Sequence, residues 1–312
     1  MLELLRPKPF RGDQVAAGAV MLTVLVLMLN VRMAGPWGPP LHLAYTALAA
    51  ALVLAMAVAA PREVDGPEPW HSALYVTGFI LTGAALANLA DVLGGDGGAG
   101  TFVFVGTALA ALGAWISQER GAATGTLLGA VAAVITTLAL LEWVASPDEV
   151  TATRYLLLVD AALLVLAALW QRVRAPADGV QLLNAAGLTV LGLALTFAVA
   201  IFGTVLFGSL NGGNTPTFDI AWGWTVVILA SGVGLLAAGA ADRERGNVLT
   251  GIALLLTFVV LASEGNLLGW PILLGAAAAA LLVIGMRPST PQPAEPPRGP
   301  GAPETQVQYP PS

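Results

Sequence analysis

The chain contains no cysteine, and only two of its 312 residues are histidine. Without cysteine it has no disulfide, no thiolate nucleophile, no iron–sulfur cluster and no cysteine-based zinc site. The two histidines, His42 and His71, are too few for a histidine-rich metal site within one chain. We therefore expect no metal site, and no motif in the chain predicts a cofactor.

Charged residues are also scarce, at 10% of the chain against about 25% in an ordinary soluble domain. The 13 basic and 19 acidic residues leave a net charge of −6, which excludes a nucleic-acid binder because such a protein needs a basic surface. Hydrophobic residues make up 57% of the chain, and the mean hydropathy is +0.80. This composition excludes a soluble enzyme and predicts an integral membrane protein whose partner is the lipid bilayer.

Continuous runs of alanine, leucine, valine and glycine are long enough to cross the bilayer as helices, since about 20 apolar residues span about 30 Å of hydrocarbon. The first run is too long for a signal peptide and lacks a small-residue cleavage site. The sequence therefore predicts an all-α bundle of ten transmembrane helices, at residues 14–33, 41–60, 71–93, 101–118, 123–145, 154–173, 181–208, 218–241, 247–264 and 269–286.

Basic residues predict how this bundle is oriented. With residues 1–13 in the cytoplasm, every basic residue except Arg32 and Arg154 falls on the inner side, as the positive-inside rule requires. We expect a multi-pass protein of a bacterial-type plasma (inner) membrane, with both termini cytoplasmic. The outer half then carries an excess of acids, which would favour cations at an outer entrance.

The last segment, residues 287–312, contains nine prolines and too few apolar residues to form a core. We interpret it as a disordered cytoplasmic tail that is partly polyproline. It is either a solubilising tail or a docking segment for a protein partner that binds proline-rich sequences.

Two segments of similar sequence suggest an internal repeat. Residues 117–121 and 242–246 both contain Glu-Arg-Gly, and Thr-Gly follows each of them. The two copies are four helices apart, an even number, so they would share one orientation in the membrane. The predicted arrangement is therefore 2+4+4, with parallel repeat units. The corresponding domains are the N-terminus 1–13, a first hairpin at 14–70, unit A at 71–180, unit B at 181–286 and the tail at 287–312.

Ionisable residues inside an apolar helix are candidates for function because a charge in hydrocarbon costs several kcal/mol. Asp160 is the clearest case, and it is either a proton or cation site in a cavity or a structural acid paired with Arg154, a threonine hydroxyl or another helix. Other polar residues in the spans either form interhelical hydrogen bonds or line a pore. The candidate ion, proton or substrate site comprises Asp160, Glu142, Glu264, Asp91, Asn88 and Arg154.

Three functions stay open at this point. The scarcity of polar residues and the proline-rich tail favour a non-catalytic membrane scaffold or assembly component. The alternative is a small-solute carrier, or a cation- or proton-coupled one, that uses Asp160. A membrane enzyme is the third. The sequence contains no His-Glu-x-x-His, no Gly-x-Ser-x-Gly, no Walker loop and no Gly-x-Gly-x-x-Gly after a strand, which argues against it. No pattern in the sequence predicts an oligomeric state.

Overall fold

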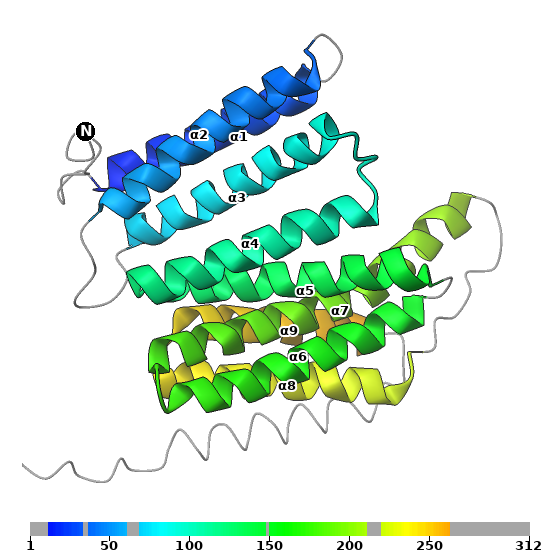
Figure 1. Cartoon of the computed structure of the whole chain (residues 1–312). Helices are drawn as coiled ribbons and strands as arrows, with labels where there is room; N and C mark the ends of the chain where they lie inside the picture. Colours follow the sequence, from blue (N-terminus) through cyan, green and yellow to red (C-terminus); the bar gives the residue numbers. More distant parts are fainter. Residues whose placement is uncertain (1–11, 34–36, 61–68, 148–149, 211–219, 263–312) are drawn as a thin grey trace, which may run out of the picture. The chain divides into compact units, whose positions relative to one another are not determined.

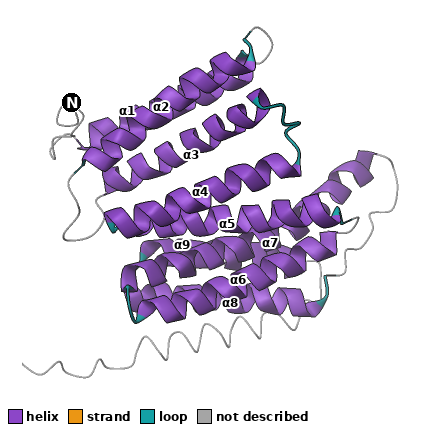
Figure 2. Ribbon diagram, viewed as in Figure 1, coloured by secondary structure: helices purple, strands orange, loops and turns teal. Residues whose placement is uncertain are grey.

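The computed structural model describes residues 12–33, 37–60, 69–147, 150–210 and 220–262, and every regular element in those ranges is an α-helix (Figures 1 and 2). Eight of these helices are long and apolar enough to cross a membrane, and α9 is a shorter apolar helix. The nine helices are α1 (Gly12–Arg32), α2 (Pro39–Ala59), α3 (Pro69–Val92), α4 (Ala99–Arg120), α5 (Ala123–Ala145), α6 (Val150–Arg172), α7 (Pro176–Leu210), α8 (Trp222–Asp242) and α9 (Arg245–Ala262).

These helices make the chain an all-α, multi-pass membrane protein. The prediction of ten spans is supported only in part, because the tenth span (269–286) and the proline-rich tail (287–312) lie outside the described residues. Most predicted ends agree within about two residues. α6 and α7 begin four and five residues earlier than predicted, since Thr151, Thr153 and Pro176 are accommodated in first turns. α8 begins at Trp222, four residues later than predicted.

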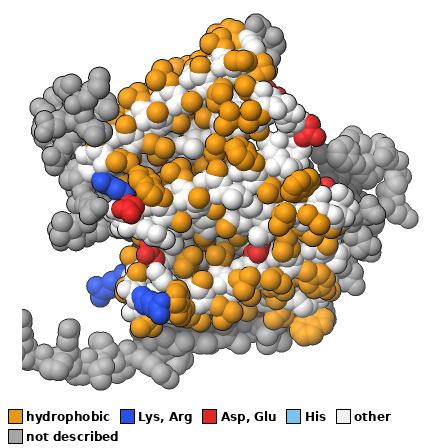
Figure 3. All heavy atoms as spheres, in the orientation of Figure 1, with side chains coloured by type: hydrophobic (Ala, Val, Ile, Leu, Met, Phe, Trp, Pro, Cys, Tyr) orange, Lys and Arg blue, Asp and Glu red, His pale blue; other side chains and the backbone are white. Residues whose placement is uncertain are grey.

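The described arginines cluster at one end of the helices. Five of them lie where α4 meets α5, where α6 meets α7 and where α8 meets α9, whereas Arg32 and Arg154 lie at the other end. Figure 3 shows the basic side chains of the visible face at the first of these ends, with hydrophobic side chains over the helices between. We call these the arginine-rich end and the arginine-poor end. Which of them faces the cytoplasm stays a prediction.

Adjacent helices pack as hairpins. The most extensive contacts join α2 to α3, α4 to α5, α6 to α7, and α8 to α9, while α1 also packs on α3, and α7 also packs on α9 and α5. The α4–α5 pair approaches closely at glycines, because a Cβ added at Gly113 would lie 2.5 Å from the Cα of Gly129. Backbones approach this closely only where side chains are absent.

The described contacts give no support to the 2+4+4 arrangement. Helix α3, expected to begin a new unit, packs more extensively on α2 and α1 than on α4. The two Glu-Arg-Gly segments also differ in structure. Gly121 ends α4 in the left-handed conformation, with a φ of 65°, whereas Gly246 lies inside α9 and Arg243 takes the left-handed position after α8. The Glu-Arg-Gly residues therefore lie at the end of one helix in the first segment and at the start of another helix in the second.

Candidate functional site

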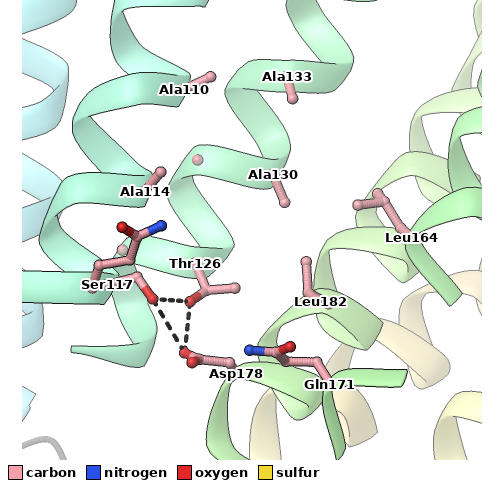
Figure 4. Close-up of a pocket in the computed structure, with 13 residues that line it drawn as sticks. Ala110, Ala114, Ser117, Thr126, Ala130, Ala133, Leu164, Gln171, Asp178 and Leu182 are labelled. Atoms are coloured by element: carbon pink, nitrogen blue, oxygen red, sulfur yellow. Dashed lines mark hydrogen bonds between the residues drawn. The ribbon is translucent and has the colours of Figure 1, made fainter. Parts of the chain in front are cut away.

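A cavity of about 590 Å³ lies between the α4–α5 hairpin and the α6–α7 hairpin (Figure 4). Its α4 and α5 walls consist largely of alanine and glycine at spacings of four residues, which places them on one face of each helix. Because these side chains are so small, they leave space between the two hairpins. The cavity is lined by Ala110, Ala114, Ser117, Gln118, Gly125, Thr126, Gly129, Ala130, Ala133, Leu164, Gln171, Asp178 and Leu182.

The polar side chains of this cavity gather at the arginine-rich end. Asp178 lies in the first turn of α7, where the helix dipole favours a negative charge. The hydroxyl of Thr126 donates a hydrogen bond of 2.6 Å to Oδ1 of Asp178, and the hydroxyl of Ser117 lies 3.5 Å from the same oxygen and 2.8 Å from Thr126 Oγ1. Figure 4 shows Gln171 beside this group. One carboxylate, two hydroxyls and the amides of Gln118 and Gln171 thus lie together at this end of the cavity, which we call its mouth.

The opposite end of the cavity is apolar and points toward Asp160. Leu164 on α6 and Ala133 on α5 line the cavity, and Asp160 and Thr137 each lie one helical turn beyond them, about 6 Å along the helix axis. The Thr137 hydroxyl donates a hydrogen bond of 2.6 Å to Oδ2 of Asp160, which is only 8% exposed. Asp160 itself is not one of the lining residues.

The partner of Asp160 is therefore a threonine hydroxyl and not Arg154. Nε of Arg154 donates to the Thr196 hydroxyl at 3.1 Å, and the guanidinium lies 3.7 Å from the centre of the Phe197 ring. Asp160 also lies deeper in its membrane span than a helix beginning at residue 154 would place it, because it is the eleventh residue of a helix of 23. It occupies the middle of the span.

Asn88 belongs to a separate polar cluster at the arginine-poor end of α1, α2 and α3. Its amide donates to Asn30 Oδ1 at 3.1 Å and to the Thr46 hydroxyl at 3.2 Å. Tyr45 donates to the same oxygen of Asn30, and Nδ1 of His42 lies 3.0 Å from it. Asn30 therefore joins three helices through one carbonyl oxygen.

The other predicted site residues that the structure describes do not join Asp160. Asp91 and Asn88 line a second cavity between α3 and α4, together with Asp96 and Leu27. Glu142 is exposed near the end of α5, and Glu264 lies outside the described residues. The structure thus places Asp160, Arg154 and Asn88 in three different surroundings. Among the described residues, no group of three or more acids or histidines could hold a metal ion.

Several polar residues inside the spans form hydrogen bonds between helices. Asn30, Asn88 and Thr137 do so as described above, and Asn184 on α7 accepts a hydrogen bond of 3.0 Å from Thr250 on α9. Thr136 is different, because its hydroxyl donates to the backbone oxygen of Ala132 in its own helix.

Sequence reasoning missed Asp178 as a site residue because it assigned residue 178 to an inner loop. Pro176 carried the signal that could have corrected this, since proline is common at the first position of a helix. A helix that begins there places Asp178 in its first turn and Leu182 one turn further along the same face. The approach of Thr126 and Ser117 depends on how two hairpins pack, which no local pattern reveals.

Comparison of the chain with protein-family models, with curated proteins and with solved structures finds no match.

Proposed function

We propose that this protein is a carrier of a small solute, coupled to protons or another cation, and that the solute binds in the cavity between α4, α5, α6 and α7. The observation that carries the proposal is the position of this cavity between two carboxylates. Asp178 lines its polar mouth, and Asp160 lies one helical turn beyond its apolar end.

The dimensions of the cavity support this function. Sites for small molecules are clefts of about 300–1,000 Å³ with mostly apolar walls and a few polar groups, and the volume of about 590 Å³ falls within that range. A site between hairpins can also change shape, because packed helices slide or rock against each other. Helices α5 and α6 share only limited contacts, whereas α5 packs more extensively on α7, so the boundary between α5 and α6 is the one we expect to move.

Asp160 is the residue that we assign to coupling. A carboxylate in the middle of a membrane span is costly unless it is protonated or paired, and Thr137 supplies a single neutral hydrogen bond. Gain and loss of a proton at Asp160 would therefore change how favourably α5 and α6 pack. In this proposal the arginine-rich end, with the mouth at Asp178, faces the cytoplasm of a cell whose plasma membrane holds the protein.

A transport screen tests the proposal without knowledge of the solute. The full chain is reconstituted into proteoliposomes, a pH gradient is imposed, the vesicles are incubated with an aqueous metabolite extract, and their contents are identified by mass spectrometry. We expect at least one solute to accumulate above the level in protein-free vesicles. Asp160→Asn, which keeps an acceptor for the Thr137 hydroxyl, should lower that accumulation about tenfold or more.

The control is Asp96→Asn, which removes a carboxylate from the arginine-poor end, outside the α4–α7 cavity. It should transport as the unmodified chain does. If no solute accumulates, or if both variants transport equally, the carrier proposal is wrong.

A scaffold or assembly function is the second candidate, and the nine prolines of residues 287–312 favour it. Affinity purification in mild detergent would then recover protein partners, and these would be lost when residues 287–312 are removed. Identical partners with and without the tail would exclude its role in docking. None of the catalytic motifs sought in the sequence favours an enzymatic function.

A further inference from the structure

We propose that the ligand of the α4–α7 cavity is a small monovalent organic cation, with its ammonium group at Asp178 and its apolar body toward Leu164 and Ala133. This inference rests on the proposed function and adds the chemical class of the solute. It follows from the charge, the shape and the hydrogen-bond acceptors of the cavity.

The charge of the cavity is a single carboxylate without a cationic partner. Among the described residues, Asp178 receives hydrogen bonds from Thr126 and Ser117 but forms no ion pair. The two described arginines that precede Asp178 in the chain are engaged elsewhere, since Arg172 pairs with Asp242 and Arg174 lies over the Trp170 ring. A carboxylate that faces a mostly apolar space favours the binding of a ligand that brings one positive charge.

The other groups at the mouth suit a nitrogen cation. Both hydroxyl contacts of Asp178 are made to Oδ1, so among the described residues none occupies Oδ2, which can accept an N–H of the ligand. Gln118 and Gln171 also line the mouth, and their amide oxygens can accept further N–H groups of an ammonium. Charge-assisted hydrogen bonds of this kind are stronger than neutral ones.

The rest of the cavity excludes two other classes of ligand. No arginine or lysine is among the described residues that line it, so an anion would lie against a carboxylate that no described lining residue balances. A divalent metal ion prefers several oxygen ligands, usually with more than one carboxylate, and Asp178 is the only acid among the described residues of the lining. The remaining walls are formed mainly by alanine, glycine and leucine, which accommodate an alkyl or aryl group.

Three probes of the same shape and different charge test this inference. Binding of 2-phenylethylammonium, 2-phenylethanol and phenylacetate to the full chain in zwitterionic nanodiscs is measured by calorimetry, with empty nanodiscs subtracted. We expect the cation to bind at least about tenfold more tightly than the alcohol, and phenylacetate not to bind.

Two variants assign the binding to the two ends of the cavity. Asp178→Asn removes the charge but retains an acceptor for Thr126, and it should weaken binding of the cation to the level of the alcohol. Ala133→Phe fills the apolar end and should weaken both of these ligands, whereas Asp96→Asn should change neither affinity. Thermal unfolding of each variant checks that it is folded.

The inference is overturned if the cation binds no more tightly than the alcohol, or if Asp178→Asn leaves its affinity unchanged. Failure of the carrier proposal is distinguishable from this result. A cation that binds at Asp178 but never enters proteoliposomes would refute transport and leave the site intact. A neutral or anionic solute that is transported without any binding of the cation would refute the site and leave transport intact.

Discussion

The close contact between α4 and α5, which we call the α4–α5 seam, predicts an order of stability for a set of glycine substitutions. An added Cβ would lie 2.5 Å from backbone atoms at Gly113, 2.8 Å at Gly125 and 3.3 Å at Gly129, whereas Gly192 on α7 has nothing within 4 Å. Substitution of each glycine by alanine should therefore destabilise the protein in the order Gly113, Gly125, Gly129, with Gly192 least affected. The order follows from how far α4 and α5 must separate to admit one methyl group.

The magnitude follows from the same distances. Ordinary contact begins near 3.4 Å, so Gly113→Ala requires the two backbones to move apart by about 1 Å, whereas Gly129→Ala requires only a small adjustment. Overpacking of this kind costs roughly 1–3 kcal/mol. All four substitutions share the gain in helix propensity of about 1 kcal/mol, so comparison with Gly192→Ala isolates the packing cost.

The free energy of unfolding can be measured for the four variants by denaturant titration in mixed micelles, with helical circular dichroism as the signal. The free energy of unfolding of Gly113→Ala should be about 1–3 kcal/mol lower than that of Gly192→Ala. Equal stability of these two variants would refute the close approach of α4 and α5. A different order among the three seam glycines would refute the register of the hairpin.

Three further predictions use the same unfolding assay. Thr137→Val removes the hydrogen bond to buried Asp160 and should cost about 1–3 kcal/mol, while Thr137→Ser should restore most of it; no recovery in the serine variant would argue against the bond. Asn30→Ala leaves three polar groups on α2 and α3 without their shared acceptor and should cost at least as much, so an unchanged midpoint would contradict the cluster. The Arg172 and Asp242 side chains are 34% and 25% exposed, so a double-mutant cycle should give a coupling of at most about 1 kcal/mol that weakens with salt, and a larger coupling that is insensitive to salt would contradict this.

Helix positions were largely predictable because each is decided by local sequence. The run at 123–145 matches α5 at both ends, and the run at 71–93 matches α3 within two residues. In lipid a backbone must satisfy its own hydrogen bonds, so a continuous apolar run has one favourable conformation. The starts of α6 and α7 were misplaced because polar residues and proline are tolerated in a first turn that lies at the membrane surface.

The internal repeat was less predictable because segments of similar sequence do not need to have similar backbone geometry. Glu-Arg-Gly at 119–121 ends α4, where glycine supplies the left-handed residue. The same letters at 244–246 begin α9, since Arg243 has already taken the left-handed conformation. The same three residues can therefore occupy different positions relative to the end of a helix.

The sequence by itself determined that this protein is helical and crosses a membrane several times, because composition and run length decide both. It also singled out Asp160, since an acid within an apolar run is visible without coordinates. Only the tertiary structure decided that Asp160 bonds to Thr137 and that Arg154 bonds to Thr196. It likewise brought Asp178 to Thr126 and opened a cavity beside them. The reason is physical: these side chains meet across helices that are 23 to 52 residues apart in the chain, and side-chain packing between helices, rather than local propensity, selects such neighbours.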